Sequence, residues 1–224
     1  MYLEAVLVCV NYSDILQITL PRNLNFFDRI NVITHNNDNE TIKLCKKYNV
    51  DITITDRMYE NKKDDFNKGK ALNEGIKELT KQDWLVIIDA DMTFSNNLRD
   101  ELKNNIKDKN KIYGIPRYLC KTHEEWNKYL IDESIISSWP CQKRKSIGVG
   151  YFQMTNFNNE IMKEMTKNNL WYSEGWGHCG RSDRYFYRSW PDDLRSSISN
   201  VYGIHLGDDS FQANWRGRTT RLFN

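Results

Sequence analysis

The sequence has few of the features that would place it in a membrane or on a nucleic acid. None of its apolar runs approaches the ~20 residues that a membrane-spanning helix requires. The 224 residues carry a formal net charge of only +2, which gives no general electrostatic reason to bind nucleic acid or an anionic membrane. The N-terminal segment contains Glu4 and too short an apolar run for a signal peptide, so we expect a first strand there and a cytoplasmic location.

Two common groups of motifs are also absent. The five cysteines are scattered, odd in number and form no Cys-x-x-Cys pair, which argues against a zinc site or a disulfide framework and for a reducing compartment. No Gly-x-Gly-x-x-Gly follows the first expected strand, where residues 11–14 are Asn-Tyr-Ser-Asp. A dinucleotide-binding Rossmann domain is therefore disfavoured.

The composition and the order of apolar segments predict one α/β domain. Hydrophobic residues make up 39% of the chain and charged residues 28%, which is typical of a globular protein. Strand and helix patterns alternate from residue 5 to about residue 100, which predicts a mostly parallel central sheet flanked by helices. The expected strands are 5–10, 30–34, 51–55, 84–88, 112–117, 148–154 and 201–206, and the expected helices are 13–21, 39–48, 68–79 and 181–190.

The most informative segment is the apolar run that begins at Trp84 and stops at Asp89 and Asp91. A short run of Val and Ile closed by polar residues predicts a strand buried on both faces of the sheet. The aspartates then lie where open α/β sheets bind ligands. Two carboxylates around the small Ala90 are suited to a hard divalent cation, although acidic pairs at strand ends are also common in solvated turns.

Several motifs in a fixed order resemble the family 2-like glycosyltransferases of GT-A fold. They include the run Asn67-Lys-Gly-Lys-Ala-Leu-Asn73, then Asp89-Ala-Asp91, then Gly148-Val-Gly150-Tyr-Phe-Gln, then a Gly-Arg-Ser-Asp sequence that ends at Asp183, and finally His205-Leu-Gly. The chain is especially similar to short glycosyltransferase-like proteins of phages and other viruses. The resemblance implies transfer of a sugar from a nucleoside diphosphate, most simply a UDP-sugar, to an acceptor hydroxyl with inversion at the sugar carbon. The expected acceptor is a glycan.

The resemblance also implies a metal centre. Asp91 is expected to bind Mn²⁺ or Mg²⁺ directly, and Asp89 to contact the ribose or to reach the metal through water. His205 matches a third ligand of related enzymes, and an imidazole beside carboxylates suits Mn²⁺ better than Mg²⁺. A hydrogen-bonded histidine at the edge of a sheet is the alternative for His205.

An acceptor hydroxyl has a high pKa and needs a positioned base as the new bond forms. Asp183 is the best match to the family's catalytic carboxylate, with Glu174 second. The family's usual pair of acidic residues is replaced here by Ser182-Asp183, which leaves the assignment open. The alternative is an ordinary acidic residue in the first turn of a helix.

Other residues are expected to bind the two substrates. On the donor side they follow the first and third strands, or lie on the helix before the metal motif, in that motif, or in the basic tail. Arginines in the tail are suited to bind a diphosphate through paired hydrogen bonds. On the acceptor side a glycine permits close approach and an aromatic ring can stack on a sugar. The donor set is Asn11, Tyr12, Asp56, Lys70, Asn73, Asp89, Ala90, Arg216 and Arg218, and the acceptor set is Gly150, Trp176 and Glu174.

The functional halves are expected to be 1–110 for the nucleotide sugar and 111–206 for the acceptor, followed by a basic tail at 207–224. Three alternatives stay open. The tail places Trp215 among arginines, as a nucleic-acid contact would, so a hydroxymethylated DNA base is a possible acceptor. A nucleotidyltransferase of similar fold is the second, and a non-catalytic sugar- or nucleotide-binding module is the third.

Overall fold

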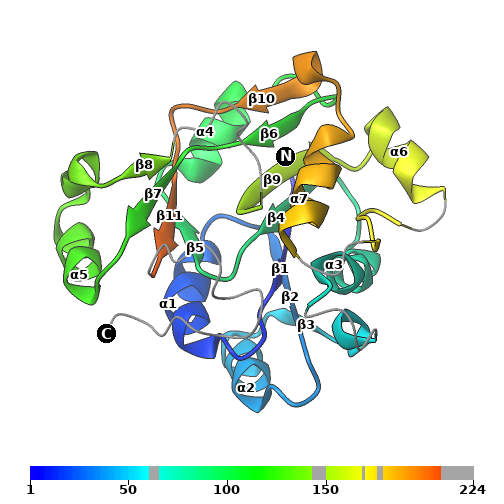
Figure 1. Ribbon diagram of the computed structural model, residues 1–224. Helices are drawn as coiled ribbons and strands as arrows, with labels where there is room; N and C mark the ends of the chain where they lie inside the picture. Colours follow the sequence, from blue (N-terminus) through cyan, green and yellow to red (C-terminus); the bar gives the residue numbers. More distant parts are fainter. Residues whose placement is uncertain (61–65, 143–149, 168–169, 176–178, 208–224) are drawn as a thin grey trace.

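The computed structural model describes residues 1–60, 66–142, 150–167, 170–175 and 179–207. Its first half alternates strands and helices as the sequence predicts (Figure 1). The elements are β1 (Leu3–Val8), α1 (Ser13–Asn23), β2 (Arg29–Thr34), α2 (Asn39–Tyr48), β3 (Asp51–Ile54), the 3-10 turn η1 (Arg57–Tyr59), α3 (Lys68–Lys77) and β4 (Trp84–Ile88). Strand β1 pairs in parallel with both β2 and β4, and β2 pairs in parallel with β3, which confirms the predicted crossovers.

The main sheet has seven strands in the order β10-β6-β9-β4-β1-β2-β3. Strand β9 (Phe152–Asn156) is antiparallel to its two neighbours, β4 and β6 (Ile112–Gly114), whereas β10 (Arg195–Ser197) is parallel to β6. Alternate residues of β4 belong to separate core clusters: Trp84, Val86 and Ile88 lie in one, Leu85 and Ile87 in the other. The strand that leads to Asp89 is thus buried on both faces, as predicted.

A second sheet lies beside the first, with the strand order β5-β11-β7-β8. It contains β5 (Met92–Phe94), β7 (Arg117–Cys120), β8 (Cys141–Gln142) and β11 (Gly203–Leu206). The prediction of one strand over 112–117 was wrong, because the chain leaves the first sheet after Gly114 and joins the second at Arg117. Pro116 lies at this crossing, where it has no N–H to donate and its carbonyl accepts from Gly203 N at 2.9 Å.

The remaining helices cover the sheets. They are α4 (Leu98–Asn105), α5 (His123–Ile131), α6 (Glu160–Thr166) and α7 (Cys179–Arg188), and α7 packs against α3 (Figure 1). The sequence analysis assigned α7 but not the other three. It also placed the start of α7 too late, so Asp183 lies in the second turn and not at the cap. Within the described residues no helix has the length and apolar character needed to cross a bilayer.

Candidate active site

The turn that follows β4 is fixed by two side chains of α1. Thr19 Oγ1 donates to the Ala90 carbonyl at 2.7 Å, and Asn23 Nδ2 donates to the Met92 carbonyl at 2.9 Å. Strand β11 holds the same turn, because Leu206 N donates to the carbonyl of Asp91 at 2.9 Å. The backbone of the predicted metal motif therefore has a defined position between α1 and the second sheet.

Asp91 and His205 meet although they are 114 residues apart in the sequence, with His205 Nε2 lying 3.2 Å from Asp91 Oδ2. Asp91 is buried, which by itself raises the pKa of its carboxyl group, but the neighbouring His205 and Arg117 outweigh the burial and lower the pKa. Asp91 Oδ1 and His205 Nδ1 are both buried atoms without a hydrogen-bond partner. The structure thus brings the two side chains together, and their shared role as metal ligands stays a prediction.

This pair has the donors and the spacing of two neighbouring ligands on one cation. Ligands that each lie about 2.1 Å from an octahedral ion, at a right angle, are about 3 Å from one another. The partnerless Asp91 Oδ1 adds a further oxygen donor. Among the described residues no group of three or more His, Cys, Asp or Glu side chains is arranged to hold a metal, so Asp89 does not complete this site. Water and substrate oxygens would have to fill the other positions.

Asp89 instead forms a short ion pair with Lys68, the first residue of α3. Lys68 Nζ lies 2.7 Å from Asp89 Oδ1 and 3.1 Å from Asp183 Oδ1, and it donates to the Gly150 carbonyl at 3.2 Å. Only 7% of the lysine side chain is exposed, so this lysine is buried and not solvated. One ammonium group therefore joins the motif after β4 to the predicted catalytic carboxylate on α7.

Asp183 is buried and is held from several sides. Tyr172 Oη donates to Asp183 Oδ1 at 2.9 Å, and Gln153 Nε2 donates to the backbone carbonyl of Asp183 at 3.0 Å. Burial raises the pKa of the Asp183 carboxyl to about 6, although Lys68 and the Tyr172 hydrogen bond both act to lower it. A carboxylate whose pKa lies near neutral pH is suited to accept a proton from a hydroxyl group. Its buried surroundings thus differ from those of a solvated helix residue.

Gly150 borders the second oxygen of this carboxylate. Its backbone has φ +94°, and a Cβ atom at this position would lie 3.0 Å from Asp183 Oδ2. The missing side chain therefore leaves room directly in front of the carboxylate, which fits the prediction that Gly150 borders the acceptor.

We expect Gly150→Ala to lower both stability and turnover. A residue with a Cβ at this φ costs ~1–2 kcal/mol, and the new methyl group would crowd Asp183. Urea denaturation and initial rates measure the two effects. Gly175→Ala is the control, since its added Cβ would meet its nearest neighbour, Ser173 Oγ, at 3.9 Å. Equal behaviour of the two variants would contradict this role for Gly150.

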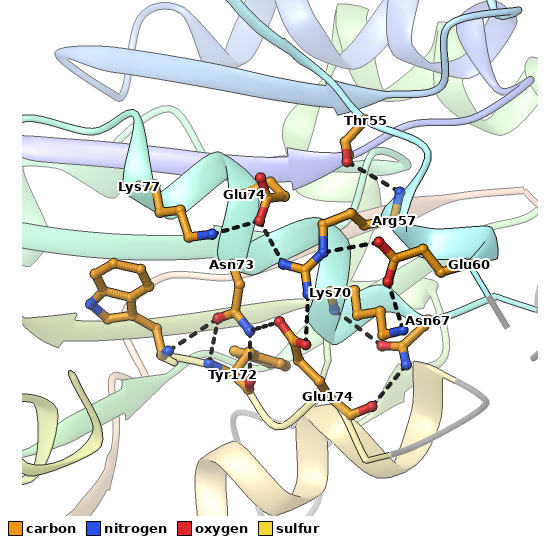
Figure 2. Close-up of polar contacts among 11 residues, drawn as sticks. Thr55, Arg57, Glu60, Asn67, Lys70, Asn73, Glu74, Lys77, Tyr172 and Glu174 are labelled. Carbon is orange, nitrogen blue, oxygen red and sulfur yellow. Dashed lines mark hydrogen bonds and ion pairs between the residues drawn. The ribbon is translucent and has the colours of Figure 1, made fainter. Parts of the chain in front are cut away.

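The Asn67–Asn73 motif docks residues 170–175 onto α3 (Figure 2). Asn67 Nδ2 donates to the Glu174 carbonyl at 2.9 Å, and at Gly69 a Cβ would lie 2.1 Å from the Ser173 carbonyl oxygen. Asn73 Oδ1 accepts from the backbone N–H groups of residues 171 and 172 at 3.1 and 2.8 Å, and its Nδ2 donates to Tyr172 O and Glu174 Oε1. Both acceptor and both donor positions of this buried amide are thereby used.

This arrangement corrects the expected role of Asn73, which holds a neighbouring segment and has no remaining hydrogen-bonding position for a nucleotide. Glu174, the second choice for the base, pairs with Arg57 Nη2 at 2.9 Å (Figure 2). Lys70 Nζ pairs with Glu60 Oε2 at 3.0 Å. Glu174 and Lys70 thus have partners within the protein, and their substrate contacts stay predictions.

The expected base-binding residues lie together at the carboxyl ends of β1 to β3. Asn11 adopts φ 54°, and its N–H donates to Asp38 Oδ2 at 2.7 Å. Tyr12 is half-buried at the start of α1. Asp56 is exposed, and one of its oxygens lies 3.2 Å from His35 Nε2. Asp38, which the sequence analysis did not single out, holds this corner of the site, since its carboxylate accepts from Asn11 N, Thr34 Oγ1 and Thr41 N.

Three expected residues, Trp176, Arg216 and Arg218, lie outside the described residues. The sequence analysis assigned no role to Lys68, Tyr172 or Gln153. A sequence signal for Lys68 exists. Lys68 follows Asn67, the N-cap of α3, and the start of this helix lies at the same edge of the sheet as Asp89. Tyr172 and Gln153 carry none, because their roles depend on packing between segments distant in the sequence.

Residues 5–183 match the sequence profile of "Glycosyl transferase family 2", and the match ends at the buried carboxylate on α7. The chain therefore belongs to glycosyl transferase family 2, and its fold is the GT-A fold. The curated proteins contain no significant match.

Solved structures share the fold at low sequence identity. TarS of S. aureus has a TM-score of 0.60 at 11% identity, with 90% of this chain aligned to 36% of that chain, so this chain spans about a third of the length of TarS. Glucosyl-3-phosphoglycerate synthase of Mycobacterium tuberculosis, solved with Mn²⁺ and UDP, has a TM-score of 0.54 at 9% identity and covers 92% and 71% of the two chains. A nucleotidyl transferase of Methanothermobacter thermautotroptrophicus has a TM-score of 0.51 at 11% identity and covers 88% and 87%.

Proposed function

We propose that this protein transfers a sugar from a nucleoside diphosphate, most simply a UDP-sugar, to a glycan hydroxyl with inversion at the sugar carbon. The observation that carries the proposal is the placement of Lys68, which contacts both Asp89 and Asp183. The motif expected to hold the donor and the carboxylate expected to activate the acceptor are joined by one side chain. Residues 1–110 would supply most of the donor site, and residues 111–206 most of the acceptor site.

In this reaction Asp183 removes the proton of the acceptor hydroxyl as the acceptor oxygen bonds to the sugar carbon. The bond between that carbon and the phosphate oxygen breaks, and its electron pair leaves with the nucleoside diphosphate. Asp183 Oδ1 accepts from Tyr172 and lies 3.1 Å from Lys68 Nζ, whereas Oδ2 faces Gly150 and has only the longer contact of 3.3 Å with Lys68 Nζ, so Oδ2 is the oxygen assigned to the acceptor. Lys68 keeps the charge of Asp183 partly balanced before the proton arrives.

Asp91 and His205 would hold a divalent cation, with Mn²⁺ favoured by the imidazole nitrogen. Such a cation supplies Lewis-acid stabilisation of the charge that develops on the leaving diphosphate. Asp89, one-third exposed at the same turn, is left with Oδ2 for a ribose hydroxyl while Oδ1 accepts from Lys68. In this proposal the protein groups orient the substrates and remove the proton, and binding of the donor also needs the cation.

A thermal-shift screen of nucleotide sugars with and without Mn²⁺, followed by transfer of labelled sugar to oligosaccharides, tests the proposal. A donor at a hundredfold excess over its dissociation constant adds ~2.7 kcal/mol to the free energy of unfolding, which gives a measurable shift. We expect the shift to need Mn²⁺ and Asp91→Asn to lose it, because the amide removes the charge that holds the cation. A donor shift that persists in this variant, or without Mn²⁺, would contradict the metal-dependent site.

The same purified protein can be tested for two other reactions. The similar nucleotidyl transferase fold makes nucleotidyl transfer the second candidate, although Asn11 to Asp14 supply no glycine-rich loop after β1. Release of pyrophosphate from UTP and a sugar phosphate would reveal that reaction. Transfer of label to hydroxymethylated DNA in preference to oligosaccharide would identify a modified base as the acceptor.

A further inference from the structure

One guanidinium group ties together three parts of the chain. Arg57, which follows β3, contacts Glu60 at 3.4 Å, Glu74 on α3 at 2.6 Å, and Glu174 in the segment 170–175 at 2.9 Å (Figure 2). The pairs are partly buried, with 31% of the Arg57 side chain and 19% of the Glu174 side chain exposed. Arg57 is also the residue after Asp56, so the junction adjoins the edge where we expect the nucleotide base.

The Arg57–Glu174 pair and the Arg57–Glu74 pair connect different parts of the chain. Glu74 and Arg57 connect η1 to α3, and neither residue is in the segment 170–175. Glu174 belongs to that segment, and its other carboxylate oxygen accepts from Asn73 Nδ2 at 2.9 Å. The same asparagine fixes the backbone N–H of Tyr172 at 2.8 Å. The Arg57–Glu174 pair therefore acts on the segment that carries Tyr172.

Tyr172 connects this segment to the proposed base. Its side chain is fully buried and stacks on Phe186 of α7, with ring centroids 4.5 Å apart. Its hydroxyl donates to Asp183 Oδ1 at 2.9 Å. A shift of residues 172–174 would thus displace a direct hydrogen-bond partner of Asp183.

We propose that Arg57 and Glu174 are positioning residues, which set the place of Tyr172 and through it the orientation of the Asp183 carboxylate. The proposal rests on the proposed function, in which Asp183 is the base. It also links the loop that adjoins the donor edge to the acceptor side of the site. Glu174 thereby receives a role in the reaction other than that of base or acceptor ligand.

Glu174→Gln and Glu74→Gln form a matched pair of variants. Each removes one carboxylate from Arg57 and keeps an amide of the same size, but only the first weakens the hold on the segment. We expect Glu174→Gln to lower kcat about tenfold, with the KM for the donor within twofold of the wild type, because small displacements of reacting groups are costly. Glu74→Gln should keep kcat within twofold. Equal kcat values in the two variants would overturn the proposal.

Hydrogen exchange at the amides of Trp171 and Tyr172 separates failure of this proposal from failure of the proposed function. Both amides donate to Asn73 Oδ1, and they should exchange faster in Glu174→Gln than in Glu74→Gln whichever reaction the protein catalyses. Equal exchange would overturn the positioning role. If the wild-type protein transfers no sugar, the proposed function is refuted. Faster exchange in Glu174→Gln would still support the structural link between Glu174 and Tyr172.

Discussion

Asp183→Asn should lower kcat by about 10²–10⁴-fold and leave the affinity for the nucleotide near that of the wild type, since a positioned base contributes on this order. The amide keeps an acceptor for the Tyr172 hydroxyl, and Lys68 keeps its ion pair with Asp89. In the wild-type protein kcat/KM should fall as the pH drops through about 6, where Asp183 gains a proton. Single-turnover rates and calorimetry with UDP measure the two quantities separately.

The stability of this variant provides the control for folding. The pKa of Asp183 in the folded protein is raised, so ionising its carboxylate costs stability as the pH rises through about 6. Asparagine removes this cost, and the melting temperature of the variant relative to the wild type should be higher at pH 7.5 than at pH 5. Weak nucleotide binding together with normal turnover at saturation would exclude Asp183 as the base.

Lys68→Met should cost about 3 kcal/mol of stability and most of the activity. Removing one partner of a buried ion pair costs about 3–5 kcal/mol, and the lower end applies here because Asp89 is one-third exposed. Without the ammonium group, the pKa of Asp183 should rise further, and the acid limb of kcat/KM should move to higher pH. Urea denaturation and a pH–rate profile measure the two effects.

Lys77→Met is the matched control on the same helix. Lys77 pairs with Glu74, and 40% of the lysine side chain is exposed, so its loss should change stability little. The acid limb should stay where it is in the wild type. If Lys68→Met shifted neither stability nor the acid limb, the bridge between Asp89 and Asp183 would have no energetic importance.

The sequence was sufficient to predict the elements whose signals are local. The β-branched run of β4 and the alternation of strands and helices up to residue 100 predicted the order and direction of β1 to β4. The break at Pro116 was missed, since it depends on β7 pairing with β11, a strand nearly ninety residues later. The helices α4 and α6, of eight and seven residues, were not assigned, because about two turns are too few to establish a helical period.

The candidate site likewise has residues that the sequence pointed to and contacts that it did not reveal. Motif order singled out Asp91, His205 and Asp183. The structure brings the first two together and connects the third to Asp89 through Lys68, while their roles stay predictions. Asn73 was assigned to the nucleotide because polar residues on a motif helix are often exposed to the ligand. Its actual partners are backbone groups of residues 171 and 172, which no local pattern reveals.

The second sheet has a consequence for biosynthesis. Asp91 gains its imidazole neighbour only when β11 inserts between β5 and β7, and loop closure over such sequence separations is slow compared with local folding. On the ribosome, a nascent chain that has not reached residue 203 already contains Asp91 and Asp183 but lacks the strand that carries His205. The Asp91–His205 pair would thus form late, after most of the domain has been synthesised, and under the proposed function a growing chain would be poor at binding the cation prematurely.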